Sequence, residues 1–359
     1  MKKFLVFGVG LLVLLFVGRQ LLLPKLAEKG FENILSQRLG ADAMADLEDG
    51  LHVYMCGAGS PLFDAKRSGP CIAVRAGERS FIFDAGTKSS QNLTPMGFPV
   101  TEVEGIFLTH LHSDHIDGLG QMLLSAWINS GRTQPTKVYG PTGTAQVVQG
   151  FNMAYQIDST YRVAHHGTTV ANPDSFGANA HEIELDDGSQ VVYEQDGVKI
   201  TATMVTHEPV HPAFGYRVDY KDRSIYISGD TSFDPRISDY AKDVDVMFHE
   251  ALNMEMVQTM ERIAKENGAT GLEKIMFDIR DYHTSPVEAA KTAKMANAEA
   301  LVLYHIVPML PNDLLIPVFV KGMDKEFDGK ITVSEDGTIV RLPTGSDKII
   351  YEDGMANFR

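Results

Sequence analysis

The sequence contains only two cysteines, Cys56 and Cys71. Two are too few for a disulfide framework, and neither belongs to a Cys-x-x-Cys pattern that would indicate a metal-binding knuckle. They flank a predicted strand-turn-strand, so one disulfide can form between them in an oxidising compartment. Two separate buried thiols are the simpler interpretation.

Basic residues are also in short supply. The 32 Lys and Arg residues stand against 47 Asp and Glu residues, which leaves a formal net charge of −15. Such a field repels polyanions, although metal ions or a local basic patch can reverse it inside a cleft. We therefore do not expect nucleic acid as a partner, and expect a small-molecule substrate instead.

Repeats and low-complexity runs are absent from the sequence. With 44% hydrophobic and 22% charged residues among 359, the chain has the balance of an ordinary globular protein. This length allows two domains, but one α/β domain with short additions fits equally well. We predict one folded domain over residues 49–343 and a peripheral tail over residues 344–359. The oligomeric state is left open.

The N-terminus has the features of a membrane segment. Lys2 and Lys3 precede an uninterrupted apolar run from Phe4 to Gly18, and the apolar residues 21–23 extend it towards the length of a transmembrane helix. No small-x-small cleavage site follows, which favours an uncleaved anchor over residues 1–23 and leaves a signal peptide open. The positive-inside rule then predicts an inner-membrane anchor with a periplasmic domain, or a secreted protein after cleavage.

The remainder alternates between strand-like and helix-like segments. Residues 24–48 have helical spacing and are predicted to form a connecting helix. Short apolar runs that end at Gly, Asp or Pro predict ten strands, within residues 51–55, 71–75, 80–83, 105–109, 137–139, 198–205, 214–220, 224–228, 244–248 and 300–304. Helices are predicted within residues 118–130, 144–155, 254–267 and 286–296. This order implies two β-sheets covered by helices.

The segment from Thr109 to Gly118 carries the strongest chemical signal. His110, His112, Asp114 and His115 place four potential metal ligands within six residues, where a predicted strand ends and a helix begins. Imidazole and carboxylate groups suit zinc, and also manganese or iron. A strand-to-helix loop lets neighbouring side chains converge instead of alternating across a sheet.

This His-x-His-x-Asp-His segment resembles the signature of the metallo-β-lactamase superfamily, and the resemblance continues along the chain in the expected order. The further motifs contain Asp84 in Phe-Asp-Ala-Gly, His207 before Phe-Gly-Tyr-Arg, Asp230 in Ser-Gly-Asp-Thr, and His305 after an apolar strand. The resemblance implies an αββα sandwich of two mixed sheets and two divalent metal ions. In that family pattern His110, His112 and His207 hold one metal, Asp114, His115 and His305 hold the second, and Asp230 bridges both. His211 is a rival to His207.

Further motifs look like those of the tRNase Z branch. Phe-His-Glu-Ala at residues 248–251 and His-Thr-Ser-Pro at residues 283–286 resemble its His-Glu-Ala-Thr and His-Ser-Thr elements, and Gly-Ala-Gly-Ser-Pro at residues 57–61 resembles its glycine-rich opening. The resemblance implies that His283 protonates the leaving group while Glu250 holds its imidazole, and that Asp114 orients the attacking water. Alternatively, His283 only precedes the N-cap of a helix.

The same branch includes exported arylsulfatases, and one departure favours them. Its tRNA-processing members carry a long arm between the third and fourth motifs, whereas only 22 residues, 208–229, separate His207 from Asp230 here. We therefore predict an exported, dinuclear hydrolase of small sulfate or phosphate esters that uses a metal-bridging hydroxide. The alternatives are a tRNase Z-like phosphodiesterase or endoribonuclease, a lactone or amide hydrolase, and a metal-free binding protein. His165, His166, Arg67 and the pair Tyr216 and Arg217 are candidate substrate contacts.

Overall fold

The structure is a computed structural model that describes residues 18–20, 22–33, 35–36, 44–45 and 47–356. It divides into two compact units, Met1–Leu47 and Glu48–Arg359. In the first unit residues 22–33 are helical, and the side chains of Leu22, Leu26 and Phe31 are exposed. Residues 4–17 of the predicted membrane segment lie outside the described residues. Within the described ranges no helix is long and apolar enough to span a membrane, so the transmembrane helix remains a prediction without structural support.

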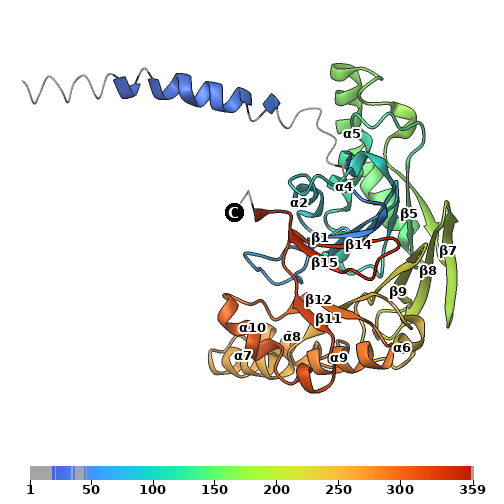
Figure 1. The fold of residues 1–359 in the computed structure, drawn as a ribbon, viewed down its shortest axis with the longest axis vertical. Coiled ribbons are helices and arrows are strands. Elements are labelled where there is room, and N and C mark those ends of the chain that lie inside the picture. Colours follow the sequence, from blue (N-terminus) through green and yellow to red (C-terminus); the bar gives the residue numbers. More distant parts are fainter. Residues whose placement is uncertain (1–17, 21, 34, 37–43, 46, 357–359) are drawn as a thin grey trace, which may run out of the picture. The chain divides into compact units, whose positions relative to one another are not determined.

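The second unit contains two mixed β-sheets (Figure 1). Both have an antiparallel half that continues into a parallel half. The first sheet, in spatial order, consists of β15 (Ile350–Asp353), β14 (Thr338–Pro343), β1 (Gly50–Gly57), β2 (Cys71–Ala76), β3 (Arg79–Phe83), β4 (Val103–Phe107), β5 (Thr136–Gly140) and β6 (Ala178–Glu182). The second sheet consists of β13 (Lys330–Val333), β12 (Ala300–Val307), β11 (Val246–Leu252), β10 (Arg223–Ile227), β9 (Ala213–Tyr220), β8 (Val198–Val205) and β7 (Ser189–Gln195).

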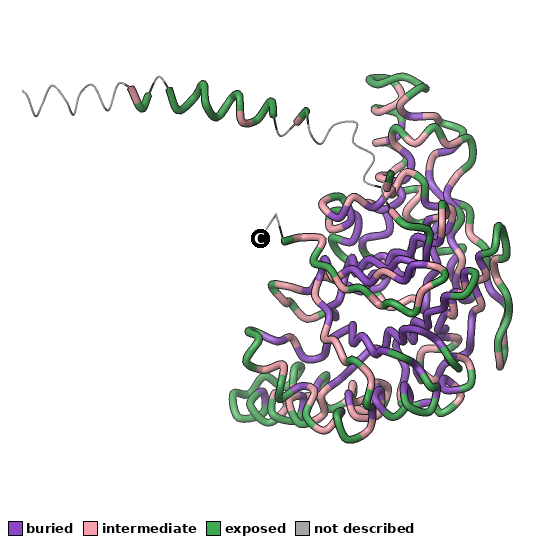
Figure 2. Tube along the Cα trace, viewed as in Figure 1, coloured by how far each residue is buried: buried purple, intermediate pink, exposed green. Residues whose placement is uncertain are grey.

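The main hydrophobic core lies between the two sheets. Strand β8 shows why: Val198, Ile200, Ala202 and Met204 share one face of the strand and all are buried in this core. Phe83 and Phe107 of the first sheet pack against Tyr216 of the second, with ring centroids 5.3 and 5.7 Å apart. Figure 2 shows the buried residues of this unit concentrated in the strands.

Helices cover the outer faces of both sheets. The described helices of this unit are α2 (Ser89–Leu93), α3 (Ser113–Ile116), α4 (Leu119–Trp127), α5 (Thr144–His166), α6 (Arg236–Tyr240), α7 (Met254–Glu266), α8 (Thr270–Asp278), α9 (Pro286–Met295) and α10 (Ile316–Phe319). Short 3-10 turns occupy Val100–Glu102, Pro173–Ser175, Asp313–Leu315 and Met323–Lys325. Helices α2, α4 and α5 contact the first sheet, and α6 and α9 contact the second (Figure 1). The predicted αββα sandwich of two mixed sheets is therefore confirmed.

Each covered face has its own packing. Three alanines of α9, Ala289, Ala290 and Ala293, are fully buried against the second sheet, which lets the helix lie close to the strands. Ser285 begins this helix with a capping box to Glu288.

Residues 344–359, predicted to be a peripheral tail, contain the last strand, β15, which pairs with β14.

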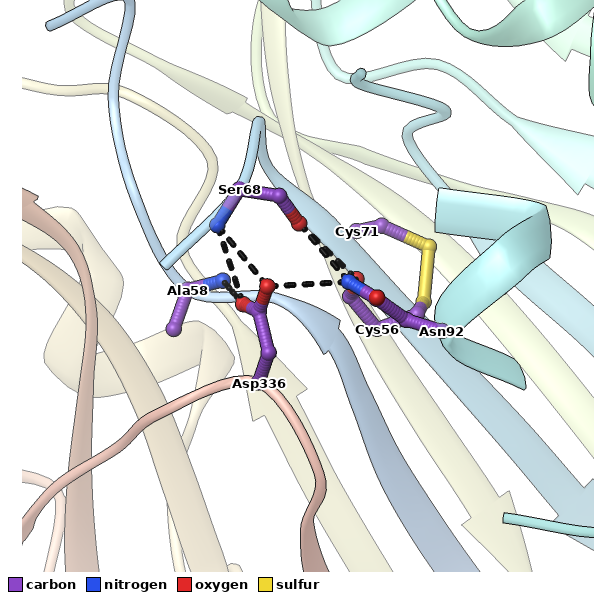
Figure 3. Close-up of a disulfide and its surroundings, with 6 residues drawn as sticks. All are labelled: Cys56, Ala58, Ser68, Cys71, Asn92 and Asp336. Carbon is purple, nitrogen blue, oxygen red and sulfur yellow. Dashed lines mark hydrogen bonds between the residues drawn. A yellow bond between two sulfur atoms is a disulfide. The ribbon is translucent and has the colours of Figure 1, made fainter. Parts of the chain in front are cut away.

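The two cysteines form a disulfide between β1 and β2 (Figure 3). Cys71 lies opposite Gly57 at a bulge, which brings it beside Cys56. The simpler interpretation of two separate thiols was therefore wrong, because the antiparallel pairing places both side chains at one end of the same hairpin. Beside the disulfide, Asp336 accepts hydrogen bonds from Ala58 N, Ser68 N and Asn92 Nδ2, which ties the loop after β1 to the C-terminal strands.

Candidate metal centre and active site

The His-x-His-x-Asp-His segment lies on the loop that follows β4 and on α3. Backbone pairing with β5 continues to Leu108, whose N–H donates to Tyr139 O at 2.8 Å, and the Tyr216 hydroxyl donates to Leu108 O at 2.7 Å. Phe214 N–H of the second sheet donates to Thr109 O at 2.9 Å. The chain leaves the sheet after Thr109, so the following side chains no longer alternate between two faces and can converge.

The second sheet delivers the remaining candidate ligands from separate strands. His207 follows the end of β8, Asp230 follows β10, and His305 lies near the end of β12. Strands β10, β11 and β12 are parallel, so their carboxyl ends meet at one edge of the sheet. A glycine precedes Asp230 because Gly229 has φ +63° and a Cβ there would lie 2.4 Å from Phe214 O.

Hydrogen bonds hold the backbone on both sides of Asp230. Gly229 N–H donates to the Tyr304 hydroxyl at 3.1 Å, and Thr231 N–H donates to Glu250 Oε1 at 3.3 Å. Both acceptor side chains are buried. The Asp230 carboxylate is thereby held between the two sheets.

All seven predicted ligands meet in one cluster centred on Asp230. Its Oδ2 lies 3.3 Å from His305 Nε2, 3.4 Å from His115 Nε2, 3.8 Å from His110 Nε2 and 3.9 Å from His207 Nε2. His112 Nδ1 is 3.0 Å from His110 Nε2, and Asp114 Oδ2 is 3.3 Å from His305 Nε2. By distance, His110, His112, His207 and Asp230 form one group and Asp114, His115 and His305 another, with ligand atoms within 4.8 Å inside each group. These two groups match the division that the resemblance implied, although Asp230, His283 and His305 also lie within this distance of one another, so the ligand roles remain a prediction.

Neighbouring groups orient the imidazole rings. Asp84 Oδ2 is 2.8 Å from His115 Nδ1, Thr109 Oγ1 is 3.0 Å from His110 Nδ1, and Tyr282 O is 3.0 Å from His207 Nδ1. Each contact occupies one ring nitrogen and directs the other, Nε2, towards Asp230. Such outer contacts are typical of histidines that bind metals.

The charges of the cluster fit divalent cations. In the described part of the chain, the ion-pair partners of Asp114 and Asp230 are all histidines, and Asp230 Oδ1 is buried without a hydrogen-bond partner. Burial lowers the pKa of His207 to about 4, which leaves its nitrogen free to act as a ligand. Burial opposes the charge on His115, but Asp230, Asp84 and Asp114 outweigh it and raise its pKa. Buried carboxylates that draw protons onto imidazoles would also attract Zn²⁺ or a similar ion.

The predicted catalytic pair lies beside this cluster. His283 Nδ1 is 3.0 Å from Glu250 Oε1, and this oxygen also accepts from Thr284 N–H at 2.9 Å. The His283 ring packs against the rings of His207 and His305, with centroids 5.5 and 5.4 Å apart. Asp114, the third predicted catalytic residue, is itself a member of the cluster.

Other candidates from the sequence lie elsewhere. His211 has a side chain that is 54% exposed and lies 3.7 Å from Glu208, so His207 occupies the position in the cluster. His165 and His166 end α5, which begins beside Leu111, so this 23-residue helix places them roughly 30 Å away. The Arg67 side chain donates to Ser334 O and that of Arg217 to Lys242 O. Tyr216 is fully buried, and none of these residues belongs to the ligand cluster.

A cleft of about 430 Å³, which no sequence pattern predicted, opens beside the cluster. His112 and His207 form its inner wall, and Phe277 and Tyr282 lie along its sides. The Tyr282 ring also contacts the rings of His207 and His283, at 4.9 and 4.8 Å between centroids. In the sequence, only the position of Tyr282 directly before His283 could have indicated that it lies near the active site. Nothing in the sequence indicated this for Phe277.

Comparison with known proteins identifies relatives of the whole domain. A family model described as a β-lactamase superfamily domain matches residues 79–306. Ribonuclease Z of Mycolicibacterium gilvum is 33% identical over 264 residues, covering 72% of this chain and 85% of the relative. Ribonuclease Z of Mycobacterium avium is 32% identical over 296 residues, covering 80% of this chain and 96% of the relative.

Solved structures share the fold. The metallo-β-lactamase fold protein YhfI of Bacillus subtilis has a TM-score of 0.59 at 16% identity, covering 82% of this chain and 100% of its own. The short form of human tRNase Z has a TM-score of 0.55 at 22% identity, covering 81% of this chain and 99% of its own. At these identities the likeness establishes the fold alone.

These relatives correct the prediction on partner and substrate and change which of the candidate functions is favoured. Nucleic acid was not expected as a partner, and a small-molecule ester was expected as the substrate. That expectation was wrong, because the relatives in sequence are ribonucleases. Net charge misled because it describes the long-range field, whereas a metal centre acts locally. The relatives also favour the alternative function, a tRNase Z-like enzyme, over the arylsulfatase-like one. From the matching domain model and the identity over most of its length, the chain belongs to the metallo-β-lactamase superfamily of hydrolases, in the tRNase Z branch.

Proposed function

We propose that this protein is a metal-dependent phosphodiesterase that cleaves RNA. The observation that carries the proposal is the identity of about one third to Ribonuclease Z of Mycolicibacterium gilvum, over 85% of that relative. The contact between His283 and Glu250 beside the ligand cluster supports it, because a phosphodiester needs a proton for its leaving oxygen. The name of the relative indicates RNA as the substrate class.

The ligand set defines where divalent ions would bind. His110, His112 and His207 would hold one ion, Asp114, His115 and His305 the other, and Asp230 would contact both. When bound, such ions polarise phosphoryl oxygens and lower the pKa of water towards neutrality. Zinc suits this donor set best, and manganese or iron also fits.

The remaining chemistry belongs to the protein side chains. The Asp114 carboxylate accepts the proton of the attacking water. Glu250 accepts a hydrogen bond from His283 Nδ1–H, which fixes the ring and leaves Nε2 to donate a proton to the departing oxygen. Thr284 N–H and Thr231 N–H hold the Glu250 carboxylate in place. One buried carboxylate therefore positions both the predicted acid and the loop of Asp230.

The test is RNA cleavage by the purified full chain. A labelled RNA hairpin with a single-stranded 3′ extension is incubated with the protein, with chelator, and with chelator followed by excess Zn²⁺ or Mn²⁺. We expect cleavage that the chelator abolishes and one of the metals restores. Absence of chelator-sensitive cleavage, with the metals shown to be bound, would rule out the proposed activity.

We also propose that the domain works outside the reducing cytosol, as the N-terminal apolar run predicts. The Cys56–Cys71 disulfide supports this, because structural disulfides persist mainly in oxidising compartments. Alkylation of protein taken directly from cells, before and after reduction, tests it. Two thiols that react without prior reduction would contradict the proposal.

A further inference from the structure

The cleft beside the metal-ligand cluster has walls of unusual composition. Phe277, at the end of α8, remains 55% exposed although it lines the cleft, and the guanidinium group of Arg280 lies 4.6 Å from its ring centroid. Tyr282 forms part of the same wall and packs on His207. An exposed aromatic ring beside a reaction centre offers a surface on which a flat ligand can stack.

The polar part of the cleft is acidic. Glu208, Asp278 and Asp281 line it, and none of the described lining residues is Lys or Arg. Lys274 pairs with Asp278, but the carboxylates of Glu208 and Asp281 would still repel a phosphate group, so the cleft does not suit the backbone of a nucleic acid. Carboxylates do accept hydrogen bonds from the exocyclic amino groups of bases, as Asp and Glu do from cytosine N4.

We propose that this cleft is a subsite for one unpaired nucleobase, which stacks on the ring face of Phe277 that Arg280 leaves open and donates its exocyclic amino group to Asp281. The inference rests on the proposed RNA cleavage. His112 and His207 are ligand candidates and also line the cleft. When a phosphodiester is held at the metal centre, the neighbouring nucleotide can therefore reach the cleft. The base therefore belongs to a nucleotide that flanks the scissile bond, and cytosine is preferred over uracil there.

The test compares RNA with and without that base. Two oligoribonucleotides each carry an abasic ribose on one side of the cleavage site, and a third is unmodified. Phe277→Ala should lower kcat/KM on unmodified RNA by about 5-fold to 100-fold, mainly through KM, because stacking on an aromatic side chain has that magnitude. On the oligonucleotide that lacks the stacked base, wild type should already be slow and the substitution should have no further effect.

Matched variants exclude an indirect effect. Ile275→Ala removes another exposed apolar side chain of α8 that does not line the cleft, and should leave kcat/KM unchanged. Asp281→Asn should abolish the preference for cytosine over uracil at the flanking position.

Each outcome decides a separate question. Equal loss on unmodified and abasic RNA, or no loss on either, would overturn the subsite while wild-type cleavage leaves the proposed function intact. Failure of the wild type to cleave unmodified RNA would overturn the proposed function and the subsite with it.

Discussion

The two sheets contribute to the candidate active site in different ways. The first sheet supplies four candidate ligands from one short segment, whose start is held by hydrogen bonds such as that from Thr109 N–H to Asp84 Oδ1 at 2.8 Å. The second sheet supplies single residues from three strands, and their meeting depends on the parallel register of β10, β11 and β12. The ligands of the first half therefore come from one contiguous segment, whereas those of the second come together only after the sheet has formed.

We expect the largest effect from Asp230, because its Oδ2 approaches ligand candidates from both sheets. Asp230→Ala should lose bound metal and lower the cleavage rate by about 10³-fold or more, since metal ions contribute several kcal/mol to such reactions. Metal content by mass spectrometry and initial rates measure both effects. Asp219→Ala, which removes a carboxylate paired with Arg217, is the control. Full metal content in the Asp230 variant would refute the assigned centre.

A substitution of His283 distinguishes catalysis from metal binding among the residues that the second sheet supplies. His283→Ala should slow turnover by roughly 10²-fold to 10⁴-fold, the usual contribution of a general acid. Its metal content should stay at the wild-type level, because Glu250 and Tyr304 still hold the backbone beside Asp230. Since a nitrogen of His283 also lies within 4.8 Å of ligand atoms of Asp230 and His305, loss of metal would instead make it a ligand.

The same contrast explains what the sequence could predict. All ten predicted strands are present, because their apolar runs are buried, and the His110–His115 motif needs only local sequence. Strands β6, β7, β13, β14 and β15 and the second half of α5 were missed. In β7 and α5 the reason is that Val191, Ile157 and Tyr161 are exposed and leave no periodic apolar pattern. Phe277 and Tyr282 reach the cleft because the end of α8 and the segment after it lie beside His207, which no local pattern encodes.

The Cys56–Cys71 disulfide tests how local the first half is. Pro70, next to Cys71, accepts a hydrogen bond from Gly86 N–H at 3.0 Å, and Ala85 N–H donates to His115 O at 2.8 Å. Replacing both cysteines by serine should lower the free energy of unfolding by about 3 kcal/mol, given a sequence separation of 15 residues. Urea unfolding measures this loss. Metal binding should weaken with it, and an unchanged metal affinity would show that the loop does not depend on the hairpin beneath it.

The smallest effect should come from the outer layer, which neither half of the site depends on. Arg262 and Glu266 pair at 2.8 Å on α7, with side chains 60% and 58% exposed. Exposed pairs of this spacing contribute no more than about 0.5 kcal/mol, because water and salt screen the charges. Arg262→Ala should therefore change the urea midpoint little and leave metal content and turnover unchanged. A loss of turnover would mean that α7 is coupled to the reaction through α8 and the cleft, and that the site extends beyond the strand ends.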